Sequence, residues 1–199
     1  SVAGVKRLVF ASSSSVYGDQ EMLPLVETMT PHPKSPYAEQ KLEAERAILG
    51  ANRQELETIA LRFFNVYGPR QDSTGNYAGL IPTAITASIQ GKLLPVYGDG
   101  EQRRDFTYVD DVVRAVLLAA TTRNTKCFGN VFNIGAGNSA SVNQVVGILD
   151  TLGKKIQRDY RAARQGEVRA TLADITKAKT LLDWQPEISL EEGLRRTYG

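Results

Sequence analysis

Arg7-Leu-Val-Phe-Ala-Ser-Ser-Ser-Ser-Val-Tyr-Gly18 is the stretch that best predicts the fold of this chain. Its first five residues form a short apolar run that ends in polar residues, which is typical of a buried strand in a parallel sheet. Residues 12–18 then form the loop at the carboxyl end of that strand, where open α/β sheets bind ligands. Serine hydroxyls at that edge can hydrogen-bond a substrate oxygen, so this loop is a candidate site, with a plain solvated loop as the alternative.

Helices and strands are expected to alternate along the rest of the chain. Ser35 followed by Pro36 is a helix N-cap with proline at the first helical position, so a helix is expected over residues 36–49. Further strands are expected at 58–64, 95–98, 106–109 and 131–134, and further helices at 80–90, 110–120, 142–152, 175–182 and 190–196. Two of these helices should begin with capping boxes, Ser141 with Gln144 and Ser189 with Glu192. The alternation predicts an α/β architecture with parallel strands.

Composition excludes several classes of protein and site. The 199 residues allow one large domain or two small ones, and a net charge of +2 predicts no attraction to nucleic acid or membranes. Cys127 is the single cysteine, which excludes an internal disulfide and a cysteine zinc cluster and fits a reducing, cytoplasmic location. His32 is the single histidine and lies in a Pro-rich turn, so neither a Ser-His-Asp triad nor a multi-histidine metal site is expected, and no metal is predicted. No stretch reaches membrane-spanning length, and no signal peptide precedes the first strand, so a soluble protein is expected.

Tyr37 and Lys41 stand four residues apart on the helix expected over 36–49, and therefore on one face of it. A lysine ammonium near a tyrosine favours the phenolate and lowers the pKa of the phenol. The tyrosine then becomes a usable general base near neutral pH. An ordinary amphipathic surface pair is the alternative interpretation.

A glycine-rich phosphate loop is missing from the sequence. Dinucleotide-binding folds place such a loop between an early strand and a helix, so that the backbone can approach a pyrophosphate. The glycines at 98, 100, 135 and 137 do not have this spacing. If the chain binds a dinucleotide, we expect the residues that bind its phosphates to lie outside this chain.

Several motifs, in order, resemble those of the extended short-chain dehydrogenase/reductases, in the NAD-dependent epimerase/dehydratase family. They are Ser12-Ser-Ser-Ser-Val-Tyr-Gly18, Ser35-Pro-Tyr-Ala-Glu-Gln-Lys41, Leu61-Arg-Phe-Phe-Asn-Val-Tyr-Gly68, Val96-Tyr-Gly-Asp-Gly100, Arg104-Asp-Phe-Thr-Tyr-Val-Asp-Asp111, Asn133-Ile-Gly135, Arg164-Gln-Gly-Glu167, Leu172-Ala-Asp-Ile-Thr-Lys177 and Trp184-Gln-Pro186. The resemblance covers essentially the whole chain and is strongest to UDP-glucose and UDP-N-acetylglucosamine 4-epimerases.

This resemblance implies a fold, a cofactor and partners. The fold would be the C-terminal part of a Rossmann-type doubly wound parallel sheet plus a smaller α/β substrate-binding domain. Residues 1–66 would belong to the dinucleotide-binding domain, with 104–122 crossing back to it, and residues 67–103 and 123–199 to the nucleotide-sugar domain. NAD would be the cofactor and a UDP-sugar the substrate. Relatives form dimers through the tyrosine-bearing helix and a neighbour, which would precede Ser1 here, so a homodimer is possible.

The resemblance also implies roles for individual residues. The catalytic set would be Tyr37, Lys41 and Ser13, and the cofactor would be contacted by Tyr37, Lys41 and Ser12. Residues that would contact the UDP-sugar are Ser14, Ser15, Asn65, Gln71, Arg104, Arg164, Glu167 and Thr171. The two arginines would hold the diphosphate, because a guanidinium donates several charged hydrogen bonds in a fixed fork.

The implied reaction is inversion at C4 of a UDP-hexose or UDP-N-acetylhexosamine through a 4-keto intermediate. Dehydratases of the superfamily carry Thr-Asp-Glu where this chain has residues 13–15, and serines cannot replace the two carboxylates that eliminate water. The loop 70–78 resembles that of epimerases acting on N-acetylated sugars, and Thr171 should leave room for an N-acetyl group. A UDP-glucuronate-type epimerase or decarboxylase, or a catalytically silent nucleotide-binding fragment, remains the alternative.

Overall fold

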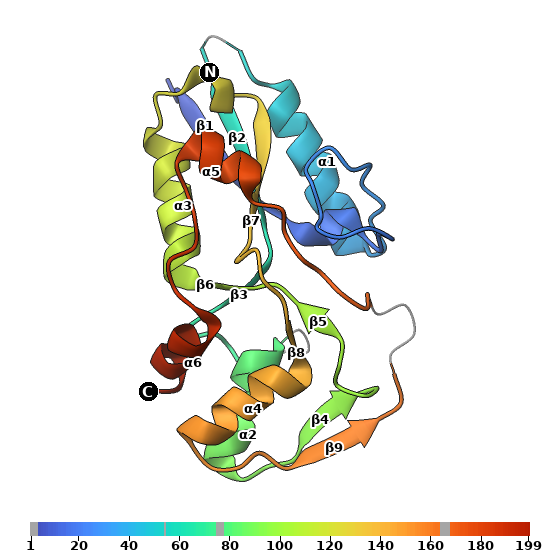
Figure 1. Cartoon of the computed structure of the whole chain (residues 1–199). Helices are drawn as coiled ribbons and strands as arrows, with labels where there is room; N and C mark the ends of the chain where they lie inside the picture. The colour runs from blue at the N-terminus through green and yellow to red at the C-terminus, as the bar shows by residue number, and fades with distance from the viewer. Residues whose placement is uncertain (1–3, 54, 75–77, 164–167) are drawn as a thin grey trace.

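A three-stranded parallel sheet forms the centre of the upper half of the molecule as Figure 1 shows it. The computed structural model describes residues 4–53, 55–74, 78–163 and 168–199. The sheet has the order β1-β2-β7, from β1 (Arg7–Ser13), β2 (Glu57–Phe63) and β7 (Asn130–Ile134). Leu8 pairs with Thr58, and Leu61 with Phe132, in parallel register. The predicted parallel α/β fold class is therefore confirmed.

Helices cover both faces of this sheet. α1 (Pro36–Gly50) packs on one face, and α3 (Val109–Thr121) and α5 (Thr176–Leu182) lie on the other (Figure 1). The first core packs between them, with Leu42 from α1, Ile59 and Leu61 from β2, and Ala115 from α3. Trp184 completes this core: it is fully buried, and its indole N–H donates to the carbonyl of Asp111 at 2.9 Å.

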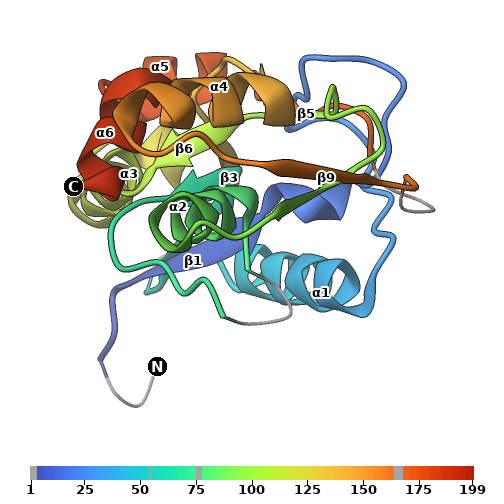
Figure 2. The same ribbon diagram turned by 90° about the horizontal axis from the view of Figure 1, so that it is seen from below.

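A second core lies in the lower half of the view in Figure 1 and is built mainly by helices. Its helices are α2 (Leu80–Gln90), α4 (Val142–Leu152) and α6 (Leu190–Tyr198). Short strand pairs border them: β4 (Leu94–Tyr97) with β9 (Arg158–Arg161), and β5 (Arg103–Arg104) with β8 (Ala140–Ser141). Figure 2, the view from below, shows β9 beside β4, its pairing partner. Among the described helices, none has the length and apolar character that a membrane crossing requires.

A third strand pair lies between the two cores. β3 (Asn65–Tyr67) pairs in parallel with β6 (Phe106–Tyr108), and Asn65 lies opposite Phe106. Tyr67 and Tyr108 stack edge to face at 5.6 Å between ring centroids. The short helical turns η1 (Ser14–Tyr17) and η2 (Thr125–Cys127) complete the described elements.

The sequence predictions of helices and strands agree with the structure apart from a few details. The short strands β3, β5, β8 and β9 were not expected. The capping box at Ser141 is confirmed by bonds in both directions. The second box is half wrong: Ser189 accepts from the Glu192 N–H, but the Glu192 carboxylate accepts from Arg195 and Arg196 instead. The division into two domains stays a prediction, although residues of β7 and α5 pack with the first core.

Candidate functional site

The serine loop at the end of β1 folds into η1, and Ser13 caps this turn. The Ser13 hydroxyl oxygen accepts hydrogen bonds from the Ser15 N–H at 3.2 Å and from the Ser15 hydroxyl at 2.9 Å. Gly18 ends the turn with φ +66°, and a Cβ there would lie 1.8 Å from the carbonyl oxygen of His32. Only glycine fits this backbone. The turn therefore holds the hydroxyls of residues 13–15 at the carboxyl edge of the sheet.

These hydroxyls open into a cavity of about 430 Å³, which we call the serine cavity. Segments far apart in the chain form its walls: β1 and η1, the start of α1, the β2–β3 junction, β5, and residues 168–171. The lining residues are Ser13, Ser14, Ser15, Gly18, Lys34, Ser35, Phe63, Phe64, Asn65, Arg104, Val168 and Thr171. Six residues predicted from the sequence thus share one cavity: the three serines, Asn65, Arg104 and Thr171.

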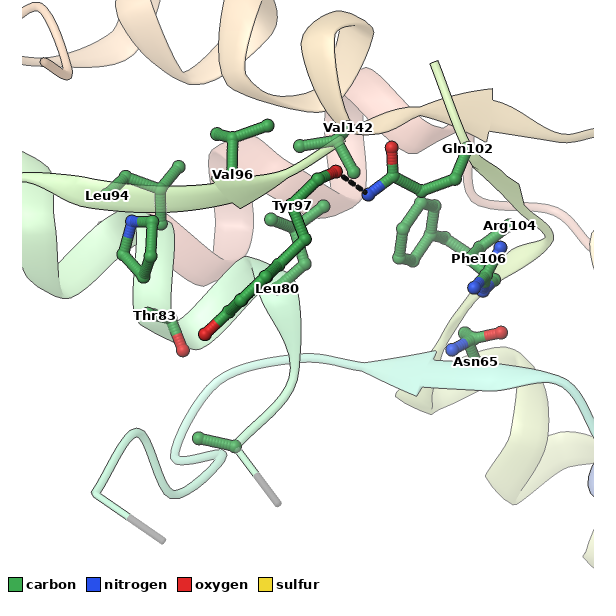
Figure 3. Close-up of a pocket in the computed structure, with 12 residues that line it drawn as sticks. Asn65, Leu80, Thr83, Leu94, Val96, Tyr97, Gln102, Arg104, Phe106 and Val142 are labelled. Carbon is green, nitrogen blue, oxygen red and sulfur yellow. Dashed lines mark hydrogen bonds between the residues drawn. The ribbon is translucent and has the colours of Figure 1, made fainter. Parts of the chain in front are cut away.

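A second cavity of about 250 Å³, the Tyr97 cavity, shares Asn65 and Arg104 with the first. Its other walls are mostly apolar and come from α2, β4, β6 and the start of α4. They are formed by Ala78, Leu80, Thr83, Leu94, Pro95, Val96, Tyr97, Gln102, Phe106 and Val142. In Figure 3 Arg104 and Asn65 lie at one end and the Tyr97 ring extends along the other, and Gln102 donates to the Tyr97 carbonyl at 3.0 Å. Arg104 and Asn65 therefore line both cavities, one rich in hydroxyl-bearing residues and one with many apolar side chains.

Tyr37 and Lys41 lie in the first two turns of α1, as expected. The Lys41 ammonium lies 5.8 Å from the centroid of the Tyr37 ring and 5.2 Å from that of Phe10. It donates to the carbonyl of Ala11 on β1 at 2.9 Å. Tyr37 is 55% exposed, and neither residue lines the serine cavity. The pairing of phenol and ammonium is thus present, while their convergence with Ser13 on one sugar stays a prediction.

A buried ionic network lies beneath this edge and explains how α1 is held. The Glu45 carboxylate accepts from the Ser12 hydroxyl at 2.6 Å and from Arg62 at 2.6 and 3.0 Å. The Arg62 guanidinium lies 4.6 Å above the Tyr17 ring. Burial raises the pKa of Tyr17 to about 12, so this phenol stays protonated. Because the Ser12 hydroxyl donates its proton to Glu45, the predicted cofactor contact of Ser12 would have to use the lone pairs of that oxygen or the backbone.

The remaining predicted site residues lie elsewhere. Gln71 donates to the carbonyl of Val66 at 3.3 Å and lines neither cavity. Arg164 and Glu167 fall outside the described residues. Their predicted substrate contacts, like that of Gln71, stay predictions.

Sequence reasoning missed several residues that line the cavities. Lys34 lines the serine cavity, and Tyr97, Gln102 and Phe106 line the Tyr97 cavity. Lys34 directly precedes the N-cap Ser35, and Tyr97 lies within the motif at residues 96–100. Proximity to these motifs was the sequence signal that could have identified both residues as cavity-lining. Nothing in the local pattern, however, says which way these side chains point.

Comparisons with known proteins give the evolutionary context of this site. Residues 1–135 match the model of the NAD dependent epimerase/dehydratase family. The UDP-glucuronate 4-epimerase of Thermodesulfobacterium geofontis is 41% identical over 197 residues, which are 98% of this chain and 58% of that protein. The chain spans 58–62% of the length of the first curated relatives that it matches.

Two solved structures of similar proteins agree closely with the fold. MoeE5 in complex with UDP-glucuronic acid and NAD has a TM-score of 0.90 and 43% identity, over 99% of this chain and 65% of that one. The UDP-glucose 4-epimerase of Thermotoga maritima with UDP-glucose has a TM-score of 0.91 and 41% identity, over 98% and 63%. The family resemblance inferred from the motifs is confirmed.

Proposed function

The chain belongs to the NAD-dependent epimerase/dehydratase family, and we propose that it carries the nucleotide-sugar pocket and the catalytic residues of a UDP-sugar 4-epimerase. In this proposal the enzyme inverts C4 of a UDP-hexose or UDP-N-acetylhexosamine through a transient 4-keto intermediate. The observation that carries the proposal is the pair of cavities that share Arg104 and Asn65 as lining residues. One cavity is rich in hydroxyl-bearing residues, the other has many apolar side chains, and the Arg104 cation belongs to both.

Each compartment suits one part of a nucleotide sugar. The Tyr97 cavity combines apolar walls with a few polar atoms, which is typical of a site for a flat heterocyclic base. Arg104 lies where a diphosphate would bridge the cavities, and a guanidinium matches phosphate geometry. The serine cavity offers hydroxyl groups at Ser13, Ser14 and Ser15, which can donate to and accept from sugar hydroxyls. The base and diphosphate would thus be held more firmly than the sugar.

The catalytic step follows from residues at the end of β1 and the start of α1. Tyr37 would act as the general base that takes the proton of the sugar 4-hydroxyl, and the Lys41 ammonium lies 5.8 Å from the centroid of its ring. Ser13 would hold the same oxygen in place. NAD, when bound, supplies the acceptor and then the donor of the C4 hydride. Arg104 would keep the diphosphate fixed while the sugar turns within the serine cavity, so that either face of its C4 could be presented to the cofactor side.

The residues present fit one end of NAD. A phenol and an ammonium beside the carboxyl end of a parallel strand are donors suited to the nicotinamide ribose. The Tyr37 side chain is exposed, which leaves this face accessible. The sequence has no glycine-rich loop for the pyrophosphate, so this chain would contribute only the nicotinamide end of the cofactor site.

One observation favours a UDP-glucuronate-type enzyme as the second candidate. Lys34 lines the serine cavity, and its ammonium also donates to the exposed Asp19 carboxylate at 3.3 Å; no acidic residue is among the described residues that line the cavity itself. A second cation besides Arg104 would suit a sugar that carries a carboxylate in addition to the diphosphate. A relative and a solved neighbour are named for UDP-glucuronate or bind it.

Substituting the proposed base tests this function. In the protein encoded by the complete reading frame, Tyr37→Phe should lower kcat by at least about a hundredfold, because general acid–base catalysis contributes on that order. Tyr160→Phe is the matched control, since Tyr160 is also 55% exposed but lies on β9 and lines neither cavity. Products should be identified from UDP-glucose, UDP-N-acetylglucosamine and UDP-glucuronate.

The outcomes separate the candidates. C4 inversion of the neutral sugars that is lost in Tyr37→Phe supports the proposal, and conversion of UDP-glucuronate alone supports the second candidate. A wild-type protein that binds UDP-sugars and converts none of them would point to a silent nucleotide-binding protein. A Tyr37→Phe variant as active as the control would refute the assigned base.

A further inference from the structure

We propose that Asp105 is a positioning residue that fixes Arg104 and Thr171 in the nucleotide-sugar site by joining three chain segments beneath it. This inference rests on the proposed function, because the residues that it positions are the proposed substrate contacts. Asp105 itself cannot touch a ligand: it is 0% exposed and lines neither cavity.

Strand geometry explains why Asp105 points away from the substrate. Arg104 ends β5 and Phe106 begins β6, and both line the Tyr97 cavity. Side chains along an extended chain alternate between its two faces, so the residue between them points to the opposite side. The carboxylate therefore enters the protein directly behind the cavity wall.

Behind that wall the carboxylate accepts three backbone hydrogen bonds. Ala136 donates at 2.6 Å and Gly137 at 3.1 Å, both from the loop after β7. Ala173 donates at 3.0 Å from the segment that leads to α5. One carboxylate thus joins the β5–β6 connection to two loops, and these bonds favour its charged form.

The segment around Ala173 carries Thr171, which lines the serine cavity. The Thr171 hydroxyl accepts from the Asp105 N–H at 3.3 Å, and the Thr171 N–H donates to the Arg103 carbonyl at 3.1 Å. Gly135 permits this close approach, because a Cβ there would lie 2.5 Å from the Ala173 Cβ and 2.9 Å from a carboxylate oxygen of Asp105. The position of Thr171 relative to Arg104 therefore depends on the Asp105 junction.

The carboxylate at this junction is buried. Burial raises the pKa of Asp105 to about 6, although the three N–H donors lower that pKa. A buried carboxylate held by backbone donors alone costs stability, which indicates that the junction serves the site more than the overall fold.

Asp105→Asn in the protein encoded by the complete reading frame tests this role. Asparagine keeps the size of the side chain but directs an NH₂ group at backbone donors, so the segments should separate. We expect KM for the UDP-sugar and Kd for UDP to rise about ten- to a hundredfold, which is the effect of losing one charged hydrogen bond between Arg104 and the substrate. The value of kcat should change less than about threefold.

Asp111→Asn is the matched control. Asp111 is also buried, and its carboxylate accepts from the N–H groups of Glu187 and Ile188 at 3.0 and 3.1 Å and, unlike that of Asp105, from an arginine, Arg114, at 2.5 Å; it lines neither cavity. This variant should lose stability without a change in KM. If Asp105→Asn does not fold, Gly135→Ala, whose new methyl group would push Ala173 and Asp105 apart, should raise KM in the same way.

Equal KM values in the variants and the control would overturn the positioning role. A fall in kcat with KM unchanged would also overturn it. The proposed function is judged separately: if the wild-type protein binds neither UDP nor a UDP-sugar, that function fails whatever the variants do.

Discussion

The buried pair of Glu45 and Arg62 allows a quantitative prediction about the helix that carries Tyr37 and Lys41. The side chains of Glu45 and Arg62 are 3% and 4% exposed, and three hydrogen bonds reach the carboxylate. Tyr37, Lys41 and Glu45 follow at intervals of four on α1, so the pair holds the same helix face against β1 and β2. The perturbation is Glu45→Gln, which keeps the shape of the side chain and removes its charge.

The expected loss of stability follows from the Arg62 charge, which the substitution leaves buried without its counterion. Glutamine keeps one acceptor oxygen, so the Arg62 charge loses its counterion while it stays buried, and Arg62 Nη1 already has no hydrogen-bond partner among the described residues. Breaking a buried pair on one side costs about 3–5 kcal/mol. That is a large part of the roughly 5–15 kcal/mol by which native proteins are stable.

Urea unfolding followed by circular dichroism measures this cost from the midpoint at unchanged slope. Asp99→Asn is the control, because the Asp99–Arg169 pair also makes two hydrogen bonds, at 2.9 Å, but its side chains are 56% and 66% exposed. Its effect on the urea midpoint should be much smaller, because solvent screens an exposed pair. Replacing both Glu45 and Arg62 by methionine should recover much of the loss, since no charge stays buried alone. A Glu45→Gln cost within about 1 kcal/mol of the control would refute the reasoning.

Two further predictions concern charge at and beneath the site. The pKa of Asp105 is raised from 3.8 to about 6 in the folded protein, so its contribution to stability is full below pH 3.8 and falls by roughly 3 kcal/mol as the pH rises through 6. Urea midpoints of wild type and Asp105→Asn at pH 4 and pH 7 check this, and a difference between the two proteins that does not change with pH would contradict it. Lys34→Gln should lower kcat/KM for UDP-glucuronate about tenfold and leave that for UDP-glucose within about twofold, because only the uronate has a carboxylate that the ammonium could bind in addition to, or in place of, Asp19. An unchanged ratio between the two substrates would remove the observation that favours the uronate enzyme.

Local patterns in the sequence predicted most of the elements and half of the cavity. The apolar run before the serines predicted β1, and Ser35-Pro36 predicted the start of α1, where the Ser35 hydroxyl accepts the Ala38 N–H at 3.2 Å. These signals are reliable because they depend on residues two to four positions apart. The short strand β3 was missed, since its three residues pair with β6, about 40 positions away, and carry no periodicity of their own.

The sequence alone determined the order of strands and helices and the spacing that places Tyr37 and Lys41 on one helix face. It also showed one histidine and one cysteine, which excludes sites that need more than one of either. Only the tertiary structure decided that Lys34 lines the serine cavity, that Ser12 is taken by Glu45, and that Asp105 joins the loops behind Arg104. Asp105 and Ala173 are 68 positions apart, and Ser12 and Glu45 are 33 apart. The physical reason is that periodicity and capping report on neighbours within a few residues, whereas such contacts arise only when packing of the two cores brings distant segments together.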